Sequence, residues 1–241
     1  MRTLARQAAA AFASLLYPAR CERCAAHVGP RDYLCGRCRD SAKRIERPFC
    51  ETCSQPFRGA IDFEFTCANC AGREFHFSHA VAHYRNRGVV RELIHRFKYD
   101  GQFHLRFPLA AWLADALHDP RIAAQPIDAL VPVPLHARRF REREFNQAAA
   151  LARLVAEGAG LPMRDCLHRI RYTTTQTHFD RVERIENLRN AFAMPHTADV
   201  RQQHLVLVDD VFTTGSTIDE CARMLMKAGA ASVRAITVAR G

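Results

Sequence analysis

The sequence predicts an α/β fold, with a mostly parallel sheet and flanking helices, preceded by a small cysteine-rich region. From residue 79 onward, short apolar runs alternate with segments of helical periodicity, which favours a parallel sheet covered on both faces. Eight of the ten cysteines form four CxxC pairs between residues 21 and 70. Since 48% of the residues are hydrophobic, the chain can bury a core. We expect an N-terminal helix over 1–20, two zinc sites over 21–78 and an α/β domain over 79–241.

The first twenty residues combine a basic start with an apolar middle, so a signal peptide has to be considered. Arg20 directly before Cys21 and the lack of a small-x-small cleavage pattern argue against one. An amphipathic helix that packs on the rest of the chain explains the segment better, because one helical face carries Leu4, Ala8, Phe12, Leu15 and Leu16. Elsewhere no apolar run reaches the eighteen residues of a membrane span, so we expect a soluble, cytoplasmic protein.

The paired cysteines have the spacing of structural zinc sites. The pairs are separated by ten and thirteen residues, and each half of the region offers four thiolates, as a tetrahedral zinc ion requires. We therefore predict two structural zinc ions in a double zinc ribbon over 21–78, held by Cys21, Cys24, Cys35, Cys38, Cys50, Cys53, Cys67 and Cys70. The pairing of CxxC turns, sequential or interleaved, stays open. Iron-sulfur clusters usually show less even cysteine spacing.

The elements of the α/β domain follow in order from residue 79. Residues 79–85 form a strand by pattern, 89–98 a helix, and 107–119 a second helix that begins near Pro108. Residues 128–134 are a short buried strand that ends at its prolines. A helix over 145–157, a strand over 205–208, a helix over 217–227 and a strand over 232–239 complete the alternation.

The strand over 205–208 is followed by Asp209 and Asp210, by a short loop, and by a helix that starts at Thr217 with Glu220 three residues on, which is the spacing of a capping box. A helix N-terminus offers unpaired N–H groups and partial positive charge to a phosphate. The two carboxylates can accept hydrogen bonds from ribose hydroxyls. We predict a 5-phosphate site formed by Thr213, Thr214, Gly215, Ser216 and Thr217.

A bare Asp-Asp pair would more often cap a loop, but strand, acid pair, threonine loop and helix together are specific. The run from Val206 to Thr217 resembles the 5-phosphoribosyl-1-pyrophosphate (PRPP) motif of type I phosphoribosyltransferases. The resemblance implies a phosphoribosyltransferase-like sheet, ribose binding by Asp209 and Asp210, and Mg²⁺ bound together with PRPP. Phe212 is bulkier than the aliphatic residue usual in that motif.

With the cysteine-rich region in front, residues 131–135 and 138–147 resemble the ComF competence family, which includes the gluconate-linked GntX proteins. The resemblance extends through residues 171–176 and 184–187 to the last strand. Members commonly have glycine where this chain has Glu144, and an acidic side chain there would weaken pyrophosphate binding. Nothing in the sequence supports a direct part in gluconate transport.

By the same resemblance, the loop after Pro134 lies where transferases hold pyrophosphate, and it offers Arg138, Arg139, Arg141 and Arg143. These side chains could instead bind DNA phosphates, although we expect Phe140 among them to pack in the core. The segment 169–189 resembles the mobile loop that closes over PRPP, with Arg171, Tyr172, Gln176 and Arg184 as its candidate ligands. A solvated crossover is the alternative for this segment.

Three classes of function remain. The resemblance favours a factor in DNA uptake, natural transformation or the use of imported single-stranded DNA, working beside a competence helicase or recombination-loading proteins. An active Mg²⁺-dependent phosphoribosyltransferase with an unknown acceptor is second, and a structural adaptor with a vestigial pocket is third. The net charge of +10, carried almost entirely by arginine, suits phosphate-bearing partners in the first two cases.

Overall fold

The computed structural model describes residues 18–57, 59, 61, 63–172, 190–195 and 198–241. All but three residues of the expected N-terminal helix lie outside the described part of the chain, so that expectation stays a prediction.

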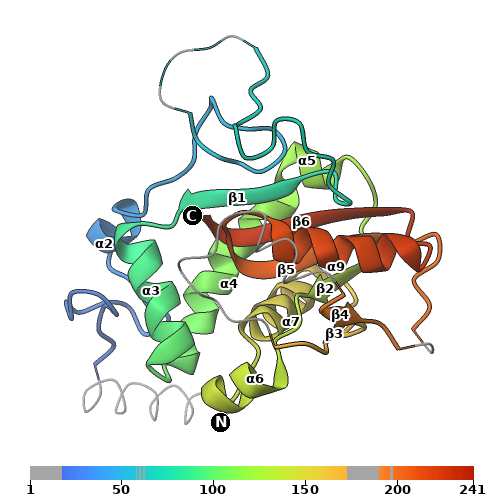
Figure 1. Ribbon diagram of the computed structural model, residues 1–241. Coiled ribbons are helices and arrows are strands. Elements are labelled where there is room, and N and C mark those ends of the chain that lie inside the picture. The colour runs from blue at the N-terminus through green and yellow to red at the C-terminus, as the bar shows by residue number, and fades with distance from the viewer. Residues whose placement is uncertain (1–17, 58, 60, 62, 173–189, 196–197) are drawn as a thin grey trace.

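A parallel sheet forms the centre of the described structure, as predicted (Figure 1). The order of its strands is β1-β6-β5-β2, and every neighbouring pair is parallel. The strands are β1 (Ala80–Arg85), β2 (Ala129–Pro132), β5 (His204–Phe212) and β6 (Ser232–Arg240). Since parallel strands all end at the same edge, the residues that follow β2 and β5 are brought to one side of the molecule.

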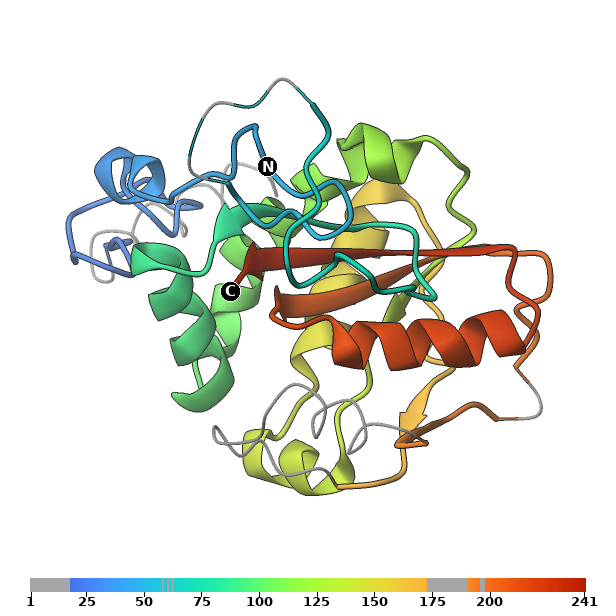
Figure 2. The same cartoon turned by 45° about the horizontal axis from the view of Figure 1, so that its top comes forward.

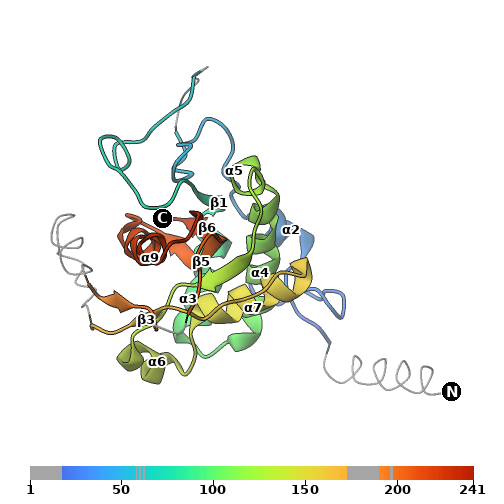
Figure 3. The ribbon, with the colours of Figure 1, turned by 90° about the vertical axis from the view of Figure 1, so that its right-hand side faces the viewer.

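Helices cover both faces of the sheet (Figure 3). Along β5, Val206 and Val208 pack into one core, whereas Leu205 and Leu207 pack into the other, as the two-residue period of a strand requires. The first core lies against α3 (Gly88–Tyr99), α4 (Arg106–Ala114) and α7 (Gln147–Ala159). The second core lies against α9 (Ser216–Lys227). The apolar runs and helical stripes of the sequence are thus buried on the faces that their periods predict.

Several boundaries differ from the sequence prediction, two of them by a full turn of helix or by several strand residues. The helix expected over 107–119 ends as α4 at Ala114 and continues as a 3₁₀ turn, η2 (Asp115–His118). The strand expected to stop at Val208 runs on to Phe212, because β5 stays paired with β6 through Phe212 and Arg240. Tertiary pairing therefore extended the strand through two charged residues that have low intrinsic strand preference.

The remaining elements are short. They are α2 (Gly36–Asp40), η1 (Phe103–Leu105), α5 (Pro120–Ala123), α6 (Ala137–Arg143), and the antiparallel pair β3 (His168–Arg169) and β4 (Phe192–Ala193). The sequence pattern gave no sign of the β3-β4 pair, because two residues are too few to show a period.

The cysteine-rich region is divided between the two cores. Cys21 and Cys38 join the core on the α3 side, and the four cysteines from Cys50 to Cys70 join the core on the α9 side. Figure 2 shows the second half of this region, in blue to teal, beside β1 and β6. Both halves therefore share hydrophobic cores with the α/β domain, and the division at residues 78 and 79 stays a proposal.

Candidate functional site

The two aspartates lie inside β5 rather than after it, which corrects the sequence prediction. Neighbouring side chains of a strand point to opposite faces. Asp210 is buried on the α3 side, where the Lys98 Nζ lies 2.6 Å from its Oδ2. Asp209 lies on the α9 side, within electrostatic range of Cys221 and Arg169. The acidic pair is therefore split across the sheet, although both backbones lie at its carboxyl edge.

Lys98 was missed by the sequence reasoning. It stands in the last turn of α3, where basic residues are common because they complement the helix dipole. Only the packing of α3 against the sheet brings its ammonium group to Asp210, 112 residues further along the chain. Lys98 thus supplies the positive charge that compensates Asp210 in this structure.

The carboxyl group of Asp209 has an unusual proton affinity. Burial and, to a lesser extent, the neighbouring carboxylate of Asp210 raise the pKa of Asp209 to about 7, against the opposing charges of Lys98 and Arg169. Burial in turn lowers the pKa of Arg169, whose guanidinium lies 5.4 Å from the ring centroid of Phe192. In the sequence, Arg169 marks only the start of the segment 169–189, and its place in the site was not predicted.

The loop after β5 leads directly into α9, but the helix begins differently from the prediction. Its N-cap is Gly215, in the left-handed region at a φ of 81°, and the helix starts at Ser216 rather than Thr217. The predicted capping box is wrong, because Glu220 accepts from the Asn190 N–H and pairs with Arg223 instead. Gly215 has no side chain with which to cap α9, and the Ser216 N–H makes only a long hydrogen bond of 3.5 Å to Thr214 Oγ1, so the start of the helix can still donate to an anion.

Hydroxyl groups surround this helix start. Thr214 Oγ1 lies 3.0 Å from Ser216 Oγ, and the Ser216 side chain is buried. Thr213 is exposed and Thr217 is half-buried. A cradle of N–H groups and hydroxyls beside two carboxylates can bind a phosphate and the hydroxyls of an attached sugar.

The four predicted arginines stand on or at the end of α6, a seven-residue helix. Arg138 and Arg139 approach the Tyr172 ring, with guanidinium carbons 4.7 and 5.9 Å from its centroid. Arg141 is exposed and lines a cavity of about 490 Å³ together with Arg169. Arg143 is directed elsewhere, because it donates to the Tyr99 hydroxyl at 3.1 Å. Arg138 and Arg139 therefore face the segment that follows β3, whereas Arg141 faces β3 itself across the cavity.

Phe140 does not pack in the core, so that expectation is wrong. Its side chain is 48% exposed and lines the same cavity as Arg141. Glu144, directly after α6, has a φ of 67° and forms the left-handed C-cap of the helix. Glycine adopts this conformation without strain, which gives a backbone reason for glycine at this position. In the segment expected to be mobile, Arg171 and Tyr172 are described, whereas Gln176 and Arg184 lie outside the described residues.

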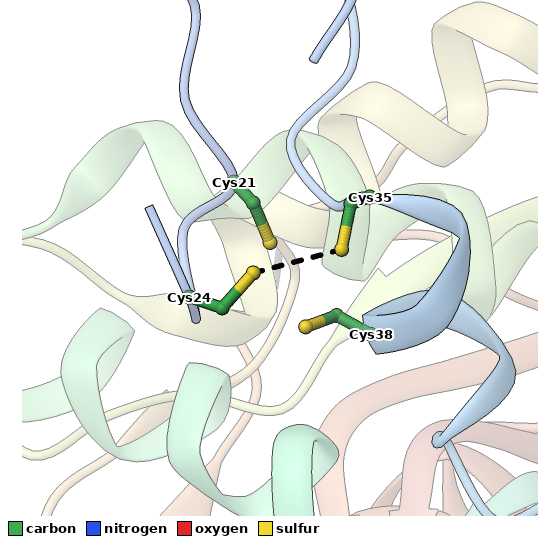
Figure 4. A group of neighbouring side chains, drawn as sticks. All are labelled: Cys21, Cys24, Cys35 and Cys38. Carbon is green, nitrogen blue, oxygen red and sulfur yellow. Dashed lines mark hydrogen bonds between the residues drawn. The ribbon is translucent and has the colours of Figure 1, made fainter. Parts of the chain in front are cut away.

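Two clusters of four cysteines lie in the described part of the chain, and they settle the pairing left open by the sequence. Cys21, Cys24, Cys35 and Cys38 form one cluster (Figure 4), and Cys50, Cys53, Cys67 and Cys70 form the other. The arrangement is therefore sequential. Within each cluster the sulfur atoms lie within 4.8 Å of one another, and the Cys24–Cys35 and Cys53–Cys67 sulfur pairs are both 3.6 Å apart.

Those distances fit zinc. Four sulfurs at about 2.3 Å from a tetrahedral ion lie about 3.8 Å from one another. Four thiolate ligands leave no open position for a substrate, so both sites have the chemistry of structural zinc ions. Separately, no helix among the described residues is long and apolar enough to cross a membrane.

The fold and the site define a class: a phosphoribosyltransferase-type α/β domain joined to a double zinc ribbon. Models of known families agree with both parts. The double zinc ribbon domain matches residues 12–71, and the phosphoribosyl transferase domain matches residues 145–241. A solved glutamine PRPP amidotransferase from B. subtilis is 23% identical over 54% of this chain and 25% of its own, with a TM-score of 0.36, too distant a likeness to bear on function.

Relatives are similar over most of the chain. Competence protein F of Haemophilus influenzae is 30% identical over 92% of this chain and 96% of its own. DNA utilization protein YhgH of Escherichia coli is 30% identical over 83% of this chain and 87% of its own. Competence protein ComFC of Streptococcus pneumoniae is 26% identical over 86% and 87%. The chain belongs to the ComF family of competence and DNA-utilization proteins.

Proposed function

We propose that this protein binds PRPP, or a related phosphoribosyl ligand, at the carboxyl edge of its sheet. One observation carries the proposal: α9 starts at Ser216 after the N-cap Gly215, which offers no side-chain cap, shortly beyond a strand that bears Asp209 and Asp210. A free helix N-terminus attracts the 5-phosphate, and the carboxylates suit the ribose hydroxyls.

Each part of the site has a distinct task in this proposal. The N–H groups and hydroxyls from Thr213 to Thr217 hold the 5-phosphate, and Asp209 and Asp210 accept hydrogen bonds from the ribose. Arg138, Arg139 and Arg141 surround the pyrophosphate, together with Arg171 and Tyr172 from the neighbouring segment. Arg143 supports α6 through Tyr99. Mg²⁺, if bound together with PRPP, would supply further positive charge for the pyrophosphate oxygens.

We further propose that the ligand-bound protein acts in DNA uptake, natural transformation or the use of imported single-stranded DNA. The names of the relatives, competence protein and DNA utilization protein, support this. Tyr172 and the exposed Phe140 offer flat rings among arginines, which is the combination that binds single strands. A competence helicase or a recombination-loading protein would be the partner, in the reducing cytoplasm where zinc thiolates persist.

The proposal is tested by calorimetric titration of the zinc-loaded protein with PRPP and Mg²⁺, and with ribose 5-phosphate alone. Asp209→Asn combined with Asp210→Asn should abolish or greatly weaken binding. Asp199→Asn is the matched control, since Asp199 is an exposed carboxylate. Within the described structure its side chain pairs with Arg201, two residues along the chain. No binding by the folded wild-type protein would refute the ligand assignment.

A second candidate function is an active phosphoribosyltransferase. The observation that favours it is the cavity of about 490 Å³ between α6 and β3, which has room for a small acceptor beside Arg141 and Arg169. In such a reaction the acceptor's lone pair forms a bond to the anomeric carbon, while the bond to pyrophosphate breaks and its electrons leave with pyrophosphate. Release of pyrophosphate from PRPP on addition of candidate nucleobases or amines, lost in Asp209→Asn, would establish turnover.

A further inference from the structure

The second zinc ribbon, which holds Cys50 to Cys70, is built into the same core as the start of α9. All four of its cysteines are buried and share a core with Ile218 of α9 and with Phe212 at the end of β5. Its backbone joins the sheet directly, since the Ala80 N–H donates to the Thr52 carbonyl at 2.7 Å. A displacement of this ribbon would therefore also shift the loop that follows β5.

Two side chains of the ribbon converge on one backbone atom of that loop. Asn69 Nδ2 donates to the Thr214 carbonyl at 3.3 Å, and Arg73 Nη1 donates to the same oxygen at 3.1 Å. The Asn69 amide also lies 3.9 Å from the sulfur of Cys70, so it bridges a zinc ligand and the loop. Thr214 is 145 residues from Asn69 in the sequence, and a local turn cannot account for this contact.

The Thr214 carbonyl matters because a trans peptide fixes the neighbouring N–H. In a planar trans peptide the C=O and the following N–H point in opposite directions. Asn69 and Arg73 hold the Thr214 C=O toward the ribbon, so the N–H of Gly215 points away from the ribbon. This N–H belongs to the N-cap residue of α9, so it is the first donor that an anion at the start of the helix would meet.

The ribbon secures both flanks of the loop as well. The His76 N–H donates to Asp219 Oδ1 at 2.7 Å, which ties the first turn of α9 to the chain that leaves the ribbon. On the other flank, Phe77 meets Phe212 edge to face at 6.1 Å between ring centroids. A Cβ added at Gly215 would come within 2.5 Å of the Phe212 ring. The bulky residue at 212, unusual for the motif, is thus accommodated by an aromatic partner from the ribbon.

We propose that Asn69 and Arg73 are positioning residues, through which the zinc-loaded second ribbon holds the loop from Thr213 to Thr217 in the conformation that binds phosphate. That this conformation binds phosphate rests on the proposed function. The hydrogen bonds from Asn69 and Arg73 to the Thr214 carbonyl, however, are present in the ligand-free protein. On this view the ribbon is part of the ligand site, and loss of its zinc releases the loop.

The test uses the full zinc-loaded chain and four single variants: Asn69→Ala, Arg73→Ala, Arg73→Lys and Arg47→Ala. Arg47→Ala is the matched control, because Arg47 precedes the second ribbon, is largely exposed and pairs with Glu51 rather than with the loop. Hydrogen exchange of the Asp219 amide, which donates to the Gly215 carbonyl at 2.8 Å, reports on opening at the start of α9 without any ligand. Zinc content is measured for every variant.

We expect exchange of the Asp219 amide to be about tenfold faster in Asn69→Ala and in Arg73→Ala, as loss of one hydrogen bond implies, with two zinc ions retained. Affinity for ribose 5-phosphate should fall about tenfold in the same variants, and Arg73→Lys should recover part of both effects. Exchange equal to that of Arg47→Ala would overturn the inference. If the wild-type protein fails to bind ribose 5-phosphate, the proposed function is refuted. The exchange rates of the Asp219 amide still show whether Asn69 and Arg73 hold the loop in place.

Discussion

The ammonium group of Lys98 lies 2.6 Å from the Asp210 carboxylate, with 18% and 9% of the two side chains exposed. The pair joins the last turn of α3 to the strand that carries the acidic residues of the site. Two charges this well buried are tolerable only together, because either one alone would be poorly solvated.

Lys98→Met should therefore destabilise the protein by about 2–4 kcal/mol, since it leaves the Asp210 carboxylate without its counter-charge. The measurement is urea denaturation at pH 8 with zinc held constant. Lys227→Met, which removes an exposed lysine at the end of α9, is the control and should change stability by no more than about 0.5 kcal/mol. Equal effects of the two substitutions would mean that the pair contributes nothing.

The raised pKa of Asp209, at about 7, predicts a pH dependence of stability. An unfolded aspartate loses its proton near pH 3.9, so between about pH 4 and 7 the folded state binds more protons than the unfolded state. The contribution of this group to stability therefore falls as pH rises through that window. Asparagine does not titrate, so the stability of Asp209→Asn relative to wild type should increase from pH 5.5 to pH 8.

Denaturation of both proteins at the two pH values gives this difference directly, and changes at the zinc sites cancel in it. Asp199→Asn serves as the control, because hydrogen bonds from Arg201 lower the pKa of Asp199 and place its titration below the window. A difference between Asp209→Asn and wild type that stays constant from pH 5.5 to 8 would contradict the burial argument.

Replacing Glu144 with glycine should increase the stability of the protein. Its φ of 67° costs a residue with a Cβ about 1 kcal/mol, so Glu144→Gly should raise the free energy of unfolding by about 0.5–1 kcal/mol. Glu144→Gln separates charge from conformation, because it keeps the strain and removes only the charge. Gly160→Ala, at the left-handed C-cap of α7, should destabilise by a similar amount. Thermal denaturation of the three variants shows whether each one gains or loses stability. A loss of stability in Glu144→Gly would contradict the argument that the backbone at residue 144 is strained.

The two zinc ions should leave at different rates. Cys24 of the first cluster is exposed and Cys35 is half-buried, whereas all four cysteines of the second cluster are buried. A colorimetric chelator should therefore release one ion in a fast phase and one in a slow phase. Cys24→Ser should remove the fast phase and leave one zinc per chain. Release of both ions in one phase would show that the two clusters open together.

The arginines of α6 predict how strongly DNA binding depends on salt. Arg138→Ala combined with Arg141→Ala should weaken binding of a labelled oligo-dT and reduce the slope of log K against log salt by about 1.4, since each single-strand phosphate contact contributes about 0.7. Arg201→Ala removes an exposed arginine near the amino end of β5 and should leave the slope unchanged. Anisotropy titrations at several salt concentrations measure this slope for each protein. Identical slopes for all proteins would exclude α6 from the DNA interface.

Much of the fold could be read from local patterns. The strands of the parallel sheet and the long helices appear where apolar runs and helical periods predict them, and the cysteine spacing predicts two four-thiolate sites. Strands of only two residues, such as β3 and β4, are too short to show a repeating pattern. The end of β5 was misplaced because pairing with β6 carries the strand through Asp209 and Asp210, and no local propensity reports a partner strand.

The sequence by itself determined which groups can do chemistry: eight cysteines in pairs, two adjacent acids after an apolar run, and a glycine among hydroxyls before a helix. These signals are local, and neighbours in the chain stay neighbours in any fold. Only the tertiary structure decided their partners. It brought Lys98 to Asp210, turned Arg143 toward Tyr99, and set Asn69 and Arg73 against the Thr214 carbonyl. Those contacts join residues far apart in the chain, and they exist only because two hydrophobic cores fix helices and ribbons against one sheet.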